Sequence, residues 1–144
     1  MAKINWNRVL LGGLLAGLIL NIIDYIVNDL ILQERWAAAM KALGKATTMT
    51  GLQIVAFVVV DFLLGIFAIW LYSAIRPRYG AGPKTAVCAG AAVWGLGSLL
   101  PSVAPTVLHL FGRRLMGISV LGSLVGMILG ALVGAWLYKE ESGR

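Results

Sequence analysis

Charged residues are scarce in this chain. Only 12% of its 144 residues are Asp, Glu, Lys or Arg, whereas soluble domains carry about 25%. Hydrophobic residues make up 60% of the chain, and the mean hydropathy is +0.89. A chain with so little polar surface is not expected to fold in water. The composition therefore predicts an integral membrane protein.

Cysteine and histidine occur once each, as Cys88 and His109. A single cysteine cannot form a disulfide within the chain, and the sequence has no Cys and His cluster with the spacing of a metal site. It also has no recognisable nucleophile–base pair and no phosphate-binding loop. We therefore expect no cofactor and no enzymatic activity.

Long apolar runs are abundant. A helix needs about 20 apolar residues to cross the hydrocarbon of a bilayer, and four runs are long enough: about 9–32, 51–75, 84–110 and 115–138. Backbone groups in lipid must be satisfied within the spanning segment, and these runs lack the alternation of barrel strands. The predicted fold is all-α, a bundle of four transmembrane helices forming a single domain over residues 1–144.

The connecting and kinked segments allow two further expectations. In the first loop, Trp36, Met40 and Leu43 recur at helical spacing, which predicts a short helix in the membrane interface. A continuation of the first helix beyond the membrane is the alternative. Pro101 and Pro105 lie in the second half of the third span, where each removes a backbone donor. They predict a bend or break in that helix.

The positive charge lies in short segments beside the spans. This is typical of membrane orientation and of contact with anionic lipid headgroups, and it does not favour nucleic acid as a partner. The side of the membrane that holds both termini carries seven basic residues: Lys3, Arg8, Arg76, Arg78, Lys84, Lys139 and Arg144. The other side carries five: Arg35, Lys41, Lys45, Arg113 and Arg114. The difference predicts cytoplasmic termini.

Glycines repeat along the last span. They stand at strict four-residue spacing, at Gly122, Gly126, Gly130 and Gly134. Helices in lipid associate through small residues that let backbones approach closely, so this spacing predicts a smooth packing groove. The groove could receive a helix of the same chain or of a second copy. Partners are therefore expected to be lipid together with further copies or other membrane subunits.

Polar residues interrupt the first two spans. Asn21, Asp24 and Asn28 share one face of the first span, and Asp61 lies in the second. A carboxylate at this depth costs roughly 2.5–3.5 kcal/mol on insertion scales, so it needs a partner, a proton or water. Both carboxylates fall in the half of the bilayer opposite the termini. His109 also belongs to that half, and Arg113 and Arg114 lie at its rim. We expect a polar pocket that opens on that side.

Three interpretations of this pocket remain open. The carboxylates could bind a cation or share a proton, they could pair with Arg113, His109 or asparagine side chains, or they could form a contact surface for another subunit. The first favours a small transporter or channel-like protein. The alternative function is a non-catalytic accessory or structural subunit of a larger membrane complex.

The chain resembles small bacterial membrane proteins known as domains of unknown function. The residues that carry the resemblance are Asn5 and Trp6 before a glycine-rich first span, the stretch from Trp36 to Gly44, and the glycine-rich last span. The resemblance covers most of the chain. It implies a four-helix protein of the bacterial inner membrane and no established activity.

Overall fold

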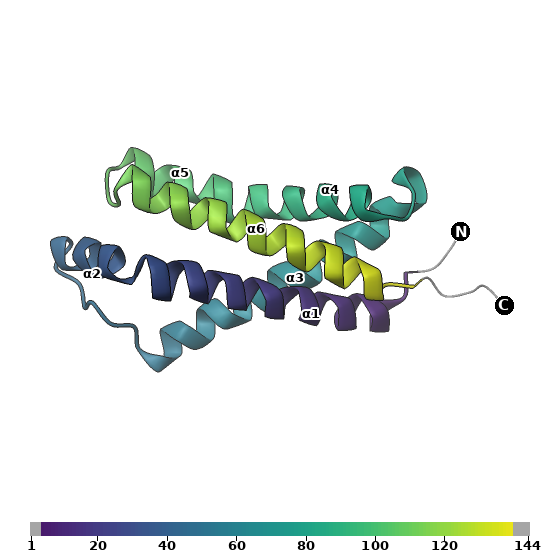
Figure 1. Cartoon of the computed structure of the whole chain (residues 1–144), viewed down its shortest axis with the longest axis horizontal. Coiled ribbons are helices and arrows are strands. Elements are labelled where there is room, and N and C mark those ends of the chain that lie inside the picture. Colours follow the sequence, from purple (N-terminus) through teal and green to yellow (C-terminus); the bar gives the residue numbers. More distant parts are fainter. Residues whose placement is uncertain (1–3, 140–144) are drawn as a thin grey trace.

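The structure, a computed structural model, describes residues 4–139 and confirms the all-α prediction (Figure 1). Four helical segments are long and apolar enough to cross a membrane: Trp6–Ile31, Gly51–Tyr79, Pro83–Val107 and Arg113–Leu137. They lie side by side as an elongated bundle, and both ends of the chain lie at the same end of it (Figure 1). The chain is an integral membrane protein with a four-helix bundle.

The first and third spans each contain a π-helical stretch. In chain order the elements are α1 (Trp6–Asp24), η1 (Tyr25–Ile31), α2 (Gln33–Ala42), α3 (Gly51–Tyr79), α4 (Pro83–Trp94), η2 (Gly95–Leu99), α5 (Leu100–Val107) and α6 (Arg113–Leu137). The π-helical stretches are η1 and η2. The η2 stretch stands directly before α5, which contains Pro101 and Pro105. The predicted irregularity of the third span is therefore a widened helical turn.

Local signals explain where several helices begin. Asn5 caps α1 by accepting a hydrogen bond from the Arg8 amide at 3.2 Å. Thr50 and Gln53 form a capping box at the start of α3, which satisfies two otherwise unpaired backbone donors. Pro83 occupies the first turn of α4, a position that tolerates its missing N–H.

α1 packs along both α3 and α6, while α4 packs against α3 and α6. Glycines make the closest approaches. A Cβ added to Gly13 would lie 2.5 Å from the Cα of Ile66 in α3, and one added to Gly130 would lie 2.7 Å from the carbonyl oxygen of Ala16 in α1. Close backbone contact of this kind is how helices gain packing energy in lipid.

The first half of α3 leaves the bundle. Residues 51–60 are all exposed, and this end of α3 diverges from the other helices (Figure 1). The second half, by contrast, contains buried Gly65, Ala68, Ile69 and Tyr72. Within the described residues, α3 has almost no contact with α5. The bundle is therefore closed at the end that holds the termini and open on one side of the other half.

The first loop forms a separate helix, α2. Leu32 interrupts the helical backbone with φ −102° and ψ 3°, so α2 does not extend the first span as one regular helix. Trp36 holds α2 to the bundle through an edge-to-face contact with Phe111, with ring centroids 5.2 Å apart. Glu34 and Lys41 are exposed, as expected for a helix at the interface.

Candidate functional site

Asn28 is the centre of a polar network in the half of the bundle opposite the termini. Its side-chain amide donates to the backbone oxygen of Asp24 at 3.2 Å. Its side-chain oxygen accepts from the Trp36 indole at 3.1 Å and from the Ser119 hydroxyl at 2.7 Å. The network joins η1 to α2 and α6. Since Asn28 bonds to side chains on both neighbouring elements, its role here is to position these segments.

Asn21 bridges the first two spans. Its amide donates to the Gly17 oxygen at 3.0 Å within α1 and to the Val58 oxygen at 3.3 Å in α3. This contact lies near the point where α3 begins to diverge. Asn21 therefore holds the two helices together beside the carboxylates.

Asp24 and Asp61 face a common region from two antiparallel helices. Gly13 packs on Ile66 and Gly17 on Phe62, and this register places Asp24 and Asp61 about six residues, or roughly 9 Å, apart along the bundle axis. The two carboxylates therefore belong to the same half of the bundle, and their backbone positions differ by more than one helical turn along its axis.

The carboxylate of Asp24 is only partly satisfied. Its Oδ1 atom is buried and has no hydrogen-bond partner. Both Asp24 and Asp61 are half-buried, and no Lys or Arg within residues 4–139 forms an ion pair with either of them. A buried carboxylate without a cation is costly unless it takes up a proton, a cation or water.

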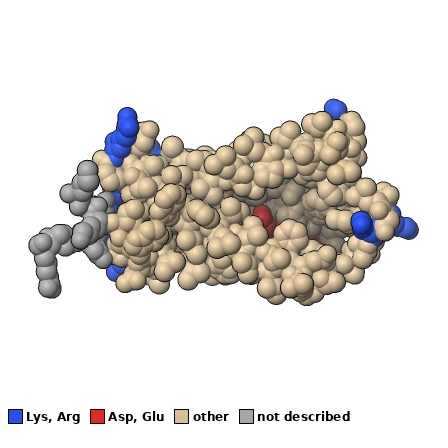
Figure 2. Space-filling model, turned by 180° about the vertical axis from the view of Figure 1, so that it is seen from behind, with Lys and Arg blue, Asp and Glu red and all other residues tan. Residues whose placement is uncertain are grey.

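A hollow gives access to this region. Figure 2 shows it on the side of the molecule where α3 diverges, with acidic atoms at its inner end. Among the described residues, Asp24 and Asp61 are the acidic residues that lie deepest in the spans, since Asp29 and Glu34 stand nearer to α2. Val55 of α3 and Val103 of α5 are among the exposed apolar residues of this half of the bundle.

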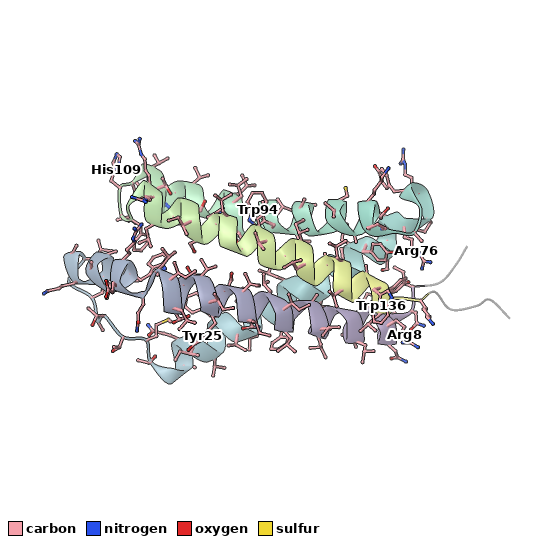
Figure 3. The ribbon with its side chains drawn as sticks, viewed as in Figure 1. Arg8, Tyr25, Arg76, Trp94, His109 and Trp136 are labelled. Atoms are coloured by element: carbon pink, nitrogen blue, oxygen red, sulfur yellow. The ribbon has the colours of Figure 1, made fainter. Side chains whose placement is uncertain are left out.

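His109 and Arg113 do not reach the carboxylates. His109 is exposed in the turn between α5 and α6, with a φ of 54° (labelled in Figure 3). Arg113 is exposed at the first residue of α6. Gly122 packs on Val27, and the helical rise places Arg113 roughly 13 Å further along α6. The interpretation in which these two side chains neutralise the aspartates has no support in this geometry.

Other polar side chains in this half of the bundle bond locally. Ser102 donates to Leu99 O, Thr106 to Ser102 O and Ser123 to Val120 O. Gln53 belongs to the cap of α3. These side chains form hydrogen bonds within their own helical segments and do not neutralise Asp24 or Asp61.

Two tryptophans contribute contacts that sequence patterns did not identify. The Trp36 indole bonds to Asn28, and the Trp94 indole donates to Val120 O at 2.9 Å, joining α4 to α6 (Figure 3). Buried indole N–H groups usually have a partner. Trp94 lies deep within an apolar run, far from either membrane boundary. This position was the one feature of the sequence that could have indicated a hydrogen-bonded indole.

The glycines of the last span face the first span. Added Cβ atoms would meet Val27 at Gly122, Ile23 and Leu20 at Gly126, Ala16 at Gly130 and Gly12 at Gly134. The groove expected from the four-residue spacing is therefore filled by α1 and η1 of the same chain.

Within residues 4–139, no three His, Cys, Asp or Glu side chains come together as a metal site would require. Comparison with family models, curated proteins and solved structures finds no match for this chain. The fold and the site together define a class: a four-helix integral membrane protein with two carboxylates inside the membrane.

Proposed function

We propose that this protein is a small transporter or channel-like protein in which Asp24 and Asp61 bind a proton or another cation inside the membrane. The observation that carries the proposal is the buried Oδ1 atom of Asp24, which has no hydrogen-bond partner. Polar and ionisable groups in spans commonly mark ion pathways or proton relays. The hollow in Figure 2 supplies a route to these groups from one side.

The arrangement supports uptake of a positive charge more than a purely structural role. A structural carboxylate would be expected to face a basic partner, and the nearest candidates from the sequence, His109 and Arg113, lie at the end of the bundle. A cation placed between Asp24 and Asp61 would relieve their mutual repulsion and their desolvation together. The closed half of the bundle, packed around α1, would form the barrier that a transport cycle has to open.

The test is flux in liposomes. Purified protein is reconstituted, and proton and monovalent-cation fluxes are measured with entrapped dyes under an imposed gradient. We expect flux that falls to the protein-free background in Asp24→Asn and Asp61→Asn. Glu34→Gln is the matched control, because it removes an exposed carboxylate on α2 and should leave flux unchanged. Equal flux in all variants would contradict the proposal.

An accessory subunit is the second candidate, and the exposed first half of α3 favours it. Ten consecutive residues, 51–60, are exposed in the single chain, and a helix of another protein could cover them. The native mass of the protein extracted from its host in mild detergent separates the two candidates. A single chain or homo-oligomer supports transport, and stoichiometric foreign subunits support the accessory role.

We further propose that the membrane is a bacterial inner membrane and that both termini face the cytoplasm. The bacterial inner membrane is what the resemblance of the sequence implies. The support for the orientation is the excess of basic residues at the end with the termini, seven against five in the whole sequence, because cytoplasmic segments are enriched in Lys and Arg. A reporter that is active only in the cytoplasm, fused after Arg144, should be active. Activity only of a periplasmic reporter at the same position would reverse the orientation.

A further inference from the structure

A second feature lies at the opposite end of the bundle, near the termini. A pocket of about 260 Å³ opens between α3, α4 and α6, and its lining residues are Tyr72, Gly82, Pro83, Ala86, Leu132, Ala135 and Trp136. The surface is almost entirely apolar. Trp136 is 79% exposed at its rim, and Figure 3 shows Trp136 and Arg76 at this end. The pocket is separate from Asp24 and Asp61 and independent of the function proposed for them.

The pocket extends from the headgroup level into the hydrocarbon. Tyr and Trp are enriched at the membrane boundary. Trp136 stands in the last turn of α6 and marks that boundary, whereas the buried Tyr72 lies about two turns before the end of α3. Leu132 lies one turn deeper than Trp136 on α6, which is about 6 Å along the helix. An occupant would thus lie with one end among headgroups and the other among acyl chains.

The volume limits what can enter. Pockets that enclose drug-sized ligands measure about 300–1,000 Å³, so 260 Å³ is too small for a whole lipid. It is large enough for part of one acyl chain. The apolar lining suits such a chain and offers little to a polar solute. The Tyr72 hydroxyl, which lines the pocket, accepts a hydrogen bond from the Gly82 amide at 3.3 Å.

The charged residues that the structure describes at this end of the bundle are all basic. Among residues 4–139, this end carries Arg8, Arg76, Arg78, Lys84 and Lys139, and the acidic residues Asp24, Asp29, Glu34 and Asp61 all lie elsewhere. Lys84 directly follows Pro83, which lines the pocket. No side chain caps the first turn of α4, so its positive dipole end stands beside the same opening.

This charge argues against a second copy of the chain as the occupant. Two copies that met through this face in the same orientation would bring Arg78, Lys84 and Lys139 of one against those of the other. Basic pockets between transmembrane helices bind anionic lipid headgroups. We propose that the pocket binds an anionic phospholipid, with one acyl chain against Leu132 and Ala86 and the phosphate beside Lys84.

The experiment compares two lipids with the same acyl chains. Protein in mild detergent is titrated with phosphatidylglycerol or phosphatidylcholine, and the thermal unfolding midpoint is followed. We expect saturable stabilisation that is greater with phosphatidylglycerol. One basic residue near a membrane surface is worth about 1 kcal/mol, so Lys84→Gln should weaken the apparent affinity for phosphatidylglycerol about fivefold.

Lys41→Gln is the matched control, since it removes one exposed lysine on α2 at the other end of the bundle. It should leave the preference unchanged. Equal stabilisation by both lipids, or an equal loss in the two variants, would overturn the proposal. Glycerol phosphate without acyl chains should not stabilise the protein, and if it matched the lipid, the acyl-chain pocket would be wrong.

A second measurement covers the case in which Lys84→Gln does not fold. Native mass spectrometry of the unaltered protein from micelles with equal amounts of the two lipids should show phosphatidylglycerol retained in preference. Retention of both in equal amounts would also overturn the proposal.

Discussion

Gly12 of α1 and Gly134 of α6 meet backbone to backbone. A Cβ added to Gly12 would lie 2.6 Å from the carbonyl oxygen of Gly134, closer than real Cβ atoms approach. The contact lies in the closed half of the bundle, near the fully buried Val9 and Ile69. It shows why the first and last spans can pack without large side chains between them, and it makes the glycines of α6 direct targets for mutation.

We predict that Gly130→Leu destabilises the bundle. Its Cβ would lie 2.7 Å from the backbone oxygen of Ala16, an atom that cannot move without shifting α1. Overpacking of this kind costs about 1–3 kcal/mol, and sometimes more. The midpoint of thermal unfolding in detergent should fall, or the protein should aggregate on extraction.

Gly117→Leu is the control for this substitution. Gly117 lies on the same helix, and nothing stands within 4 Å of a Cβ there. The same change in side chain should therefore be tolerated. Equal losses at Gly130 and Gly117 would show that the close helix contact does not decide stability.

We predict that Ser119 and Asn28 are energetically coupled. Ser119→Ala and Asn28→Ala each remove one partner of a 2.7 Å hydrogen bond between α6 and η1. Interhelical bonds in membranes contribute about 0.6 kcal/mol on average and up to about 1.7 kcal/mol. A double-mutant cycle on the free energy of unfolding should give a coupling within this range.

Ser102→Ala is the control for loss of a serine hydroxyl that makes no contact between helices, because Ser102 donates to Leu99 of its own span. Its coupling to Asn28→Ala should be zero within error. A coupling as large as that of Ser119 would indicate that the measured effect is not the contact across the helices.

Trp94→Phe should loosen the contact of α4 with α6. The substitution keeps an aromatic ring but removes the donor that reaches Val120 O at 2.9 Å, which leaves a carbonyl less well satisfied at membrane depth. We expect a loss of about 1–2 kcal/mol in unfolding free energy. Trp70→Phe, at a more exposed residue of α3, should change stability less, and the reverse order would contradict the structure.

The hollow beside the aspartates should admit water. After Cys88, the only cysteine of the chain, is replaced by alanine, Asp24→Cys and Asp61→Cys should react with a membrane-impermeant thiol reagent. Ala68→Cys is the control, since Ala68 has an exposed fraction of 0% and should stay unlabelled. If both aspartate positions were as unreactive as Ala68, the route in Figure 2 would be closed in the membrane.

The sequence by itself determined the elements of this protein. Apolar runs long enough to span a bilayer leave helices as the way to satisfy the backbone, and the structure places its four spans within a few residues of those expected. The cap at Thr50 with Gln53 and the irregular third span before Pro101 also follow from local chemistry. The sequence left open whether the segment after the first span continues that helix or forms a separate one, and the structure shows a separate helix. These features depend on neighbours along the chain.

Only the tertiary structure decided which polar residues meet. Helical spacing put Asn21, Asp24 and Asn28 on one face, but the axial offset of α1 and α3 separated their roles: Asn21 reaches Val58, and Asn28 reaches Ser119. Pairing of the aspartates with His109 or Arg113 was one of three interpretations left open by the sequence, and the structure places both residues at the end of the bundle. The sequence also did not predict the divergence of α3 or the pocket beside Trp136. Both depend on how helices distant in the chain cross. Close glycine contacts set that crossing, and apolar patterns in lipid do not specify it.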